Sequence, residues 1–143
     1  MKYRSSLQIK DSSDKITFMR YPNRKKNKGL RRLFLAFINS FSGFGFALKE
    51  ESSFRQELFL SLILIPVALF SPSNLLEKLL MVSSVIILLI VELINSCIEA
   101  TIDRISLSHH NLSKRAKDLG SAAVFLSLIL VIVVYITILL QYL

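Results

Sequence analysis

The sequence predicts an all-α membrane protein, built from three transmembrane helices and an N-terminal amphipathic helix at the membrane surface. Hydrophobic residues make up 52% of the chain and its mean hydropathy is +0.53, yet its formal net charge is +8. The two properties are separated along the sequence, because 11 of the 18 Lys and Arg precede Leu33 and long later stretches carry none. A basic segment followed by long apolar runs is typical of an integral membrane protein with its basic end in the cytoplasm.

The 143 residues allow one domain at most, preceded by a basic tail. Residues 1–29 are polar and charged, include the run RKKNK at 24–28, and lack the apolar core of a cleavable signal peptide. We expect a flexible cytoplasmic tail whose basic run touches anionic headgroups. Nucleic acid is the competing partner for such a run, but few aromatic residues are interleaved with it, so we expect no nucleic-acid binding. Residues 30–143 then form the membrane domain.

Residues of about 30–50 are predicted to form the surface helix. Its apolar face is made of residues that recur every three or four positions, namely Phe34, Phe37, Phe41, Phe44 and Leu48. A second stripe, which begins at Arg32 and ends at Glu51, consists mostly of small residues, namely Ala36, Ser40, Gly43 and Ala47. A helix with a Phe-rich face and a basic flank lies in the plane of the membrane interface. The small stripe lets a ligand or a neighbouring helix approach closely.

The three spans are predicted at about 53–70, 79–103 and 117–143. The apolar part of the first has only 13 residues, 58–70, fewer than the ~20 that cross a bilayer, so its polar start must lie near the interface. The second contains the single cysteine, Cys97, for which we expect a packing role. The third carries no charge from 119 to 143 and spans with ease. Basic residues in the tail and the second loop put both in the cytoplasm, so the C-terminus faces outward.

One polar stripe interrupts the apolar surface of the second span. Glu92, Glu99 and Asp103 fall within roughly 40° of one another on a helix, and Asn95 lies about 60° to the side. A carboxylate inside a bilayer is costly and marks a functional site by default. Three acids and an amide on one face therefore predict a metal and proton-transfer site. A structural contact between packed helices is the simpler alternative.

The polar residues expected at cytoplasmic depth favour phosphoryl transfer from a nucleotide. Carboxylates and an amide suit Mg²⁺, a hard ion that keeps waters and bridges to phosphates. Arg32, Arg115 and Lys117 add positive charge for a polyphosphate, and a further carboxylate can serve as general base. The sequence has no P-loop or other glycine-rich phosphate loop. The alternatives are a proton-coupled transporter subunit and a structural lipid-binding subunit, but the acids lie toward one side of the membrane and no inverted repeat is present.

Three segments resemble those of a known family: 91–104 (VELINSCIEATIDR), 115–124 (RAKDLGSAAV) and 51–57 (ESSFRQE). The pattern E-x-x-N-x-x-x-E-x-x-x-D on a membrane helix, followed by a histidine and then A-K-D, resembles the prokaryotic integral-membrane diacylglycerol kinases. The likeness extends over about 31–143 and leaves out the basic tail.

The resemblance implies a homotrimer in the bacterial cytoplasmic (inner) membrane that phosphorylates a lipid alcohol with MgATP at the cytoplasmic interface. By position, Glu92 resembles the family's catalytic base, and Glu51 and Glu99 resemble its Mg²⁺-bridging, nucleotide-contacting acids. The other residues that the resemblance places near ATP are Arg32, Asn39, Asn95, Ser108, His109, His110, Lys117 and Asp118. Those that it places near the lipid, together with Glu92, are Arg32, Ser40, Gly43, Phe54, Arg55, Gln56 and Ser121.

Two branches of the family differ in the lipid alcohol. The acid helix also matches the sister branch, which phosphorylates undecaprenol. The segments FRQE at 54–57 and GSAAV at 120–124 resemble the diacylglycerol branch more closely, so we expect diacylglycerol as substrate and phosphatidic acid as product. Asn39 and Ser108 depart from the residues that the family has at those positions, and the chain contains no Trp.

Overall fold

The computed structural model describes residues 8–10, 16–18, 29–106 and 108–143. These residues belong to two compact units, Met1–Phe37 and Ile38–Leu143. Most of the predicted basic tail, including the run 24–28, lies outside the described residues.

The N-terminal unit contains a short pair of strands that the sequence analysis did not predict. β1 (Gln8–Lys10) pairs antiparallel with β2 (Ile16–Phe18), with Ile9 opposite Thr17. The unit also contains the first turns of α1 (Leu30–Glu50). Gly29, just before the helix, has a φ of 65°, a left-handed conformation that glycine adopts without steric cost. The all-α prediction therefore describes the membrane part of the chain.

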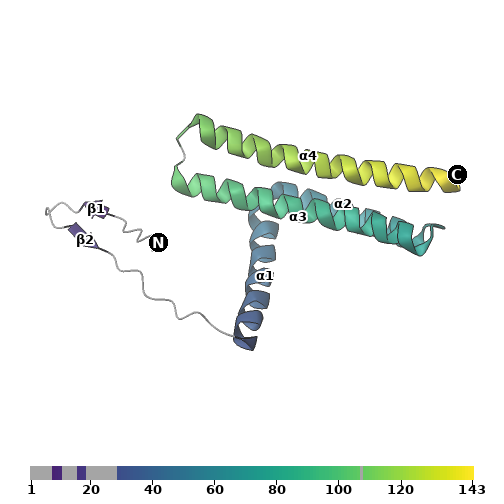
Figure 1. Ribbon diagram of the computed structural model, residues 1–143, viewed down its shortest axis with the longest axis horizontal. Helices are drawn as coiled ribbons and strands as arrows, with labels where there is room; N and C mark the ends of the chain where they lie inside the picture. Colours follow the sequence, from purple (N-terminus) through teal and green to yellow (C-terminus); the bar gives the residue numbers. More distant parts are fainter. Residues whose placement is uncertain (1–7, 11–15, 19–28, 107) are drawn as a thin grey trace. The chain divides into compact units, whose positions relative to one another are not determined.

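The C-terminal unit is a set of helices, shown in Figure 1. After α1 the chain forms, in order, α2 (Ser52–Phe70), α3 (Leu75–Ile105), α4 (Asn111–Leu139) and the 3₁₀ turn η1 (Leu140–Tyr142). Within the described part of the chain, three helices are long and apolar enough to cross a membrane. They are α2 with 19 residues, α3 with 31, and α4 together with η1 with 32. The prediction of three spans is confirmed.

Two of these helices begin earlier than the sequence analysis predicted, because side chains cap them. α3 begins at Leu75 instead of about 79, since Asn74 Oδ1 accepts the Glu77 N–H at 3.0 Å. Glu77 Oε2 accepts the Asn74 N–H at 2.9 Å in return, which completes a capping box. α4 begins at Asn111 instead of about 117, and His110 Nδ1 accepts the Leu112 N–H at 3.2 Å.

Large apolar side chains remain exposed along the spanning helices. Leu62 on α2 is 66% exposed, Ile94 on α3 is 55% exposed, and Phe125 on α4 is 63% exposed. In water such a surface would aggregate, whereas lipid tails solvate it at no cost. The exposed apolar surface and the helix lengths together identify a membrane protein.

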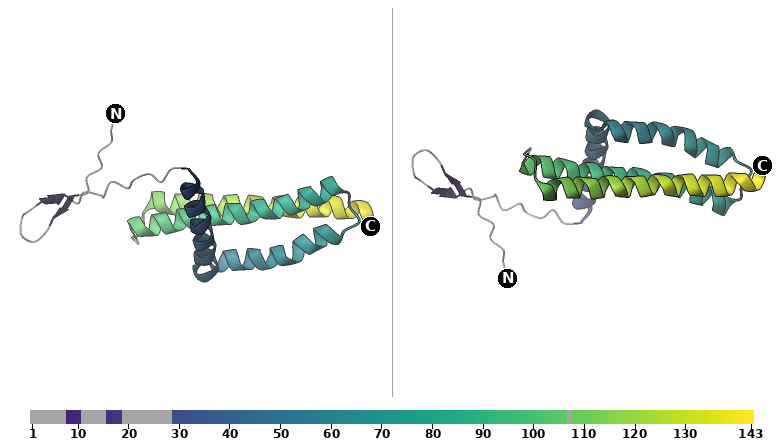
Figure 2. Two further views of the ribbon diagram at one scale, coloured as in Figure 1. Left: turned by 90° about the horizontal axis from the view of Figure 1, so that it is seen from below. Right: turned by 90° about the horizontal axis from the view of Figure 1, so that it is seen from above.

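The corner between α1 and α2 is fixed by two adjacent residues. Arg55 Nη1 donates to the backbone carbonyls of Leu48 and Lys49, each at 3.2 Å, and so satisfies carbonyls in the last turn of α1. Phe54 is 1% exposed and lies against Phe44, with 6.4 Å between the ring centroids. Figure 2 shows that residues 38–50 of α1 run across the direction of α2–α4 rather than along it.

The apolar core holds α2, α3 and α4 together at the end of the unit away from α1. Its buried members come from all three helices: Ala68, Met81, Val85, Leu88, Val131, Tyr135 and Ile138. The Tyr135 hydroxyl donates to the Leu64 carbonyl at 3.0 Å and thereby links α4 to α2. Figures 1 and 2 both show α3 and α4 running side by side over most of their length. This pairing brings the polar part of α3 against the start of α4.

Candidate active site

The acids of α3 are progressively less buried toward the C-terminal end of the helix. Glu92 keeps 3% of its surface exposed and Asn95 keeps 9%, whereas Glu99 is half-buried and Asp103 is exposed. The core continues from Leu88 directly to Glu92, so this carboxylate lies at the boundary between apolar and polar packing. A carboxylate in that position loses most of its contact with water and needs charged or polar partners.

Glu92 interacts electrostatically with three other carboxylates, which belong to three parts of the chain. They are Glu99 on α3, Glu51 between α1 and α2, and Glu57 on α2. Like charges in a poorly hydrated region repel one another, and a cation at the centre of the group removes the repulsion. The fold therefore gathers Glu51, Glu92 and Glu99, all of which the sequence singled out, into one electrostatic cluster.

Glu57 is a member of this cluster that the sequence analysis missed. Its side chain is half-buried, and its Oε2 atom is buried without a hydrogen-bond partner among the described residues. The segment ESSFRQE already contained the signal. Glu57 follows Glu51 by six residues and directly precedes an apolar run that is too short to cross a bilayer alone, so its carboxylate must enter the membrane boundary and find a partner there. The packing of α2 on α3 then brings it within electrostatic range of Glu92.

Asn95 links the deep part of the stripe to its half-buried part. Its Nδ2 atom donates to Glu99 Oε1 at 3.0 Å, one helical turn along α3. Its Oδ1 atom is buried and has no partner among the residues described. The Asn95 amide therefore orients the Glu99 carboxylate through its NH₂ group, while its Oδ1 atom accepts no hydrogen bond from the described residues.

Two ion pairs follow at the cytoplasm-directed ends expected for α3 and α4. Lys117 Nζ lies 2.6 Å from Asp103 Oδ1 and joins the two helices. Lys114 Nζ lies 2.6 Å from Asp118 Oδ2 on the same helix. Both pairs are exposed to a third or more of their surface, so each is weak and can be exchanged for a stronger anionic or cationic partner.

A pocket of about 370 Å³ lies beside these ion pairs, at the loop between α3 and α4. It brings together five residues that the resemblance placed near ATP: Ser108, His109, His110, Lys117 and Asp118. His110 also caps α4, so its ring is held in one orientation by the backbone. The pocket combines imidazole, hydroxyl and ammonium groups, which suit a polar ligand that carries phosphate.

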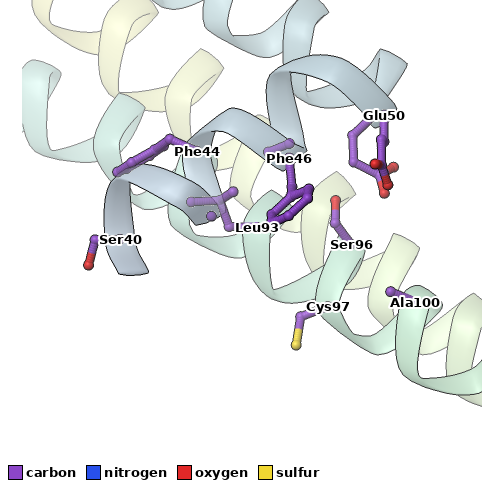
Figure 3. A pocket seen from close by; sticks show the side chains of 11 residues that line it. Ser40, Phe44, Phe46, Glu50, Leu93, Ser96, Cys97 and Ala100 are labelled. Atoms are coloured by element: carbon purple, nitrogen blue, oxygen red, sulfur yellow. The ribbon is translucent and has the colours of Figure 1, made fainter. Parts of the chain in front are cut away.

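A larger groove of about 600 Å³ lies between the C-terminal half of α1 and α3 (Figure 3). Of the residues predicted near the substrates, it is lined by Ser40, Gly43 and Glu51. Its remaining walls were not predicted and are mainly apolar or small: Phe44, Phe46, Ala47, Leu93, Ser96, Cys97 and Ala100, with Glu50 at one end. The groove thus joins an apolar wall to the carboxylate of Glu51.

Cys97 does not have the packing role within the protomer that the sequence analysis predicted. Its side chain is exposed and lines the groove together with Ser96 and Ala100 (Figure 3). The helical angle explains the difference, because these residues lie on a face of α3 beside the acid stripe rather than against α4. In the sequence, the small residues Ser96, Cys97 and Ala100 on that face were the feature that could have predicted a groove.

The remaining predicted residues are not gathered in either pocket. Phe54 and Arg55 hold the corner described above, Gln56 and Ser121 are exposed, and Asn39 is exposed on α1. Arg32 is exposed and belongs to the N-terminal unit. Contacts of these residues with substrate remain predictions.

The described residues contain no group of three or more His, Cys, Asp or Glu close enough to hold a metal ion. Mg²⁺ is commonly bound by only one or two carboxylates, with waters and substrate phosphates completing its coordination. Glu51 and Glu99 beside Glu92 fit an ion that arrives with a nucleotide, and they do not fit a cage made by the protein alone.

Comparison with known proteins finds a matching family model and several named relatives. Residues 38–139 match the family model described as prokaryotic diacylglycerol kinase. The chain is 47% identical over 116 residues to a Pseudomonas aeruginosa protein named diacylglycerol kinase, a match that covers 81% of this chain and 94% of that protein. Proteins of the same name from Haemophilus influenzae and Escherichia coli K12 are 44% and 38% identical. These matches cover 77% and 75% of this chain, and 93% and 88% of the two relatives. The chain belongs to the prokaryotic diacylglycerol kinase family.

Proposed function

We propose that this protein transfers the γ-phosphate of ATP to the free hydroxyl of diacylglycerol, giving phosphatidic acid and ADP. The observation that carries the proposal is the position of Glu92, which is buried at the boundary of the core and interacts electrostatically with Glu51, Glu57 and Glu99. Family membership gives the reaction class, and the relatives carry the name diacylglycerol kinase.

The apolar groove is suited to the lipid part of the substrate. Its walls from α1 and α3 present phenylalanine, leucine and small side chains, and Glu51 lies at its edge. A diacylglycerol molecule keeps its acyl chains in the bilayer and its hydroxyl at headgroup depth. The groove lets the hydroxyl reach the carboxylates without removal of the chains from an apolar environment.

Glu92 acts as the general base. Its carboxylate takes the proton of the lipid hydroxyl while the hydroxyl oxygen forms a bond to the γ-phosphorus. The bond from that phosphorus to the β,γ-bridging oxygen breaks, and ADP leaves with the electron pair. Mg²⁺, when bound with ATP, offsets the charge of the phosphate oxygens. Glu51 and Glu99 would hold the ion on the protein side, and Asn95 Nδ2 donates to Glu99 and keeps its carboxylate in position.

The nucleotide is held by groups at the start of α4. Lys117 exchanges Asp103 for the phosphates, since a polyphosphate offers it more negative charge than one exposed carboxylate. Ser108, His109 and His110 line the neighbouring pocket and contact the rest of the nucleotide. In this arrangement ATP comes from the aqueous side while the lipid comes from the bilayer.

The working form is a homotrimer in the bacterial inner membrane, with the N-terminus and the α3–α4 loop in the cytoplasm. Basic residues near that loop support this orientation, because Lys114, Arg115 and Lys117 lie at its edge. The loop between α2 and α3 is followed by Lys78 and has no cluster of this kind.

The test is transfer of label from γ-labelled ATP in mixed micelles that contain either diacylglycerol or undecaprenol. We expect label in phosphatidic acid, dependent on Mg²⁺, and none in Glu92→Gln protein. Glu77→Gln is the matched control, because Glu77 lies at the opposite end of α3 and glutamine also completes a capping box. Preferential labelling of undecaprenol would assign the chain to the other lipid, and no labelled lipid would refute a kinase.

A further inference from the structure

Asn95 can adopt only one orientation while it holds Glu99. A carboxylate accepts hydrogen bonds and cannot donate them, so the NH₂ group of the amide must face Glu99. Nδ2 donates to Glu99 Oε1 at 3.0 Å, and Oδ1 consequently points to the other side of the amide. That atom is buried and has no hydrogen-bond partner among the described residues.

The space that Oδ1 occupies is available only because residue 120 of α4 is glycine. A Cβ atom placed on Gly120 would collide with Asn95 Oδ1 and would lie 3.3 Å from Cγ and 3.9 Å from Cβ of Asn95. Gly120 is itself buried. By contrast, a Cβ atom on Gly43 or Gly45 of α1 would have nothing within 4 Å.

We propose that Gly120 is a positioning residue for the reaction, acting through Asn95 on the metal-binding carboxylate of Glu99. The inference rests on the proposed role of Glu99 in holding the magnesium ion that accompanies ATP. Glycine lowers helix stability relative to alanine, so a buried glycine inside a membrane helix has a steric purpose. Here it admits the carbonyl oxygen of the amide, which leaves the NH₂ group free to hold Glu99.

A side chain at 120 can be accommodated in two ways, and both disturb the site. Either the Asn95 amide turns, which removes the hydrogen bond to Glu99, or α4 moves away from α3. In the second case the contact between Lys117 and Asp103 also lengthens, since Lys117 lies one turn before Gly120 on the same helix. Partners that orient a metal ligand commonly change metal affinity 10–100-fold when they are removed.

The experiment is a double-mutant cycle of Gly120→Ala and Asn95→Ala, with Gly45→Ala as the matched glycine control. Two quantities are measured on the assembled protein. The first is the midpoint of thermal unfolding, and the second is the affinity for Mn²⁺ in the presence of ADP, followed by electron paramagnetic resonance. Neither depends on turnover. Mn²⁺ substitutes for Mg²⁺ because both ions prefer carboxylate and phosphate oxygens.

In the wild-type background, we expect Gly120→Ala to weaken Mn²⁺ binding about tenfold and to lower the unfolding midpoint. In the Asn95→Ala background, which lacks the carbonyl oxygen, Gly120→Ala changes neither quantity further. Gly45→Ala changes neither. If Gly120→Ala does not assemble alone but does so together with Asn95→Ala, the collision is equally demonstrated.

Equal effects of Gly120→Ala in both backgrounds would overturn the proposal, because the glycine would then serve helix packing in general. A lower midpoint with unchanged Mn²⁺ affinity would also overturn it, as would failure of the double variant to assemble. A wild-type protein that phosphorylates no lipid would refute the proposed kinase alone. The Mn²⁺ cycle would still report whether Gly120 positions Glu99.

Discussion

The α3–α4 pair has two halves that use the same helices in opposite ways. In the apolar half, around Val85 and Tyr135, the core side chains are buried against one another and each buried hydroxyl has a partner. In the polar half, 92–103 of α3 and 114–120 of α4, charged side chains gather and Asn95 Oδ1 is buried without a partner among the described residues. Ser96 Oγ, and Glu57 Oε2 on neighbouring α2, share this property.

The contrast between the two halves indicates where a ligand binds. Buried polar atoms in proteins nearly always have hydrogen-bond partners, and those without one mark strain or a functional site. The apolar half satisfies this rule and stabilises the fold. Among the described residues, the polar half departs from it at Asn95 and Ser96, and we propose that substrate, its metal ion and a second protomer complete this half.

The largest expected effect is the loss of turnover in Glu92→Gln. The substitution keeps the shape of the side chain and removes the group that takes the hydroxyl proton, which typically slows a reaction 10²–10⁴-fold. Binding of MgATP should change little, so the unfolding midpoint should rise with added MgATP as it does in wild type. Near-normal turnover in a folded Glu92→Gln protein would show that another group is the base.

A substitution in the apolar half should have the opposite profile. Leu88 is 1% exposed, so Leu88→Ala should lower the free energy of unfolding by about 2–5 kcal/mol. Turnover per folded molecule should stay close to wild type at a temperature where both proteins remain assembled. The pair of measurements is a denaturation curve and a specific activity. A large loss of turnover with unchanged stability would remove the distinction between the halves.

A smaller effect is expected for Glu51→Gln and Glu99→Gln. Each loses a charge that offsets the metal, so the Mg²⁺ concentration for half-maximal activity should rise, on the order of tenfold. Glu50→Gln is a useful comparison, because Glu50 is adjacent to Glu51 but is not among the carboxylates that act on Glu92. The metal role would be wrong if neither variant needed more Mg²⁺ and both kept wild-type turnover.

The smallest effect on catalysis is expected for removal of 1–28. This segment contributes none of the proposed site, so specific activity in detergent should be unchanged. Association with anionic vesicles should weaken by about 1 kcal/mol for each basic residue that lies near the surface, and salt should abolish the difference. A truncated protein that assembles normally but is inactive would show that the tail belongs to the site.

Much of the fold could be predicted because hydrophobic periodicity and length determine membrane helices. The prediction failed at helix starts: the apolar run suggested about 79 for α3, but the capping pair of Asn74 and Glu77 extends the helix to Leu75. The strands β1 and β2 were missed because three-residue strands give almost no periodic signal.

The site was predicted only as far as one helix face could show it. Glu92, Asn95 and Glu99 share a face whatever the tertiary structure, whereas the approach of Glu57 depends on how α2 packs on α3. The steric link between Gly120 and Asn95 is likewise a property of two packed helices, and the sequence indicated only that small residues begin the third span. The groove walls at Ser96 and Cys97 needed the position of α1.

The claim that a second protomer completes the polar half can be tested most directly by mixing two inactive variants. Within one chain, Lys117 pairs with Asp103 on α3, while the adjacent Asp118 pairs with Lys114 on its own helix. Asp118 is not among the carboxylates that act on Glu92 within the chain, and we expect it to serve the site of a neighbouring chain.

The measurement is the kinase activity of Glu92→Gln protein and Asp118→Asn protein after joint unfolding and reassembly, with mixing verified by two different affinity tags. Each variant reassembled alone should remain inactive. Random mixing of equal amounts should restore about one quarter of wild-type activity. In a shared site, the chain that supplies residue 92 carries an intact Glu92 in about half of the cases, and the chain that supplies residue 118 carries an intact Asp118 in about half. Proven mixing without any recovery would show that Glu92 and Asp118 act from the same chain, and would contradict a site shared between protomers.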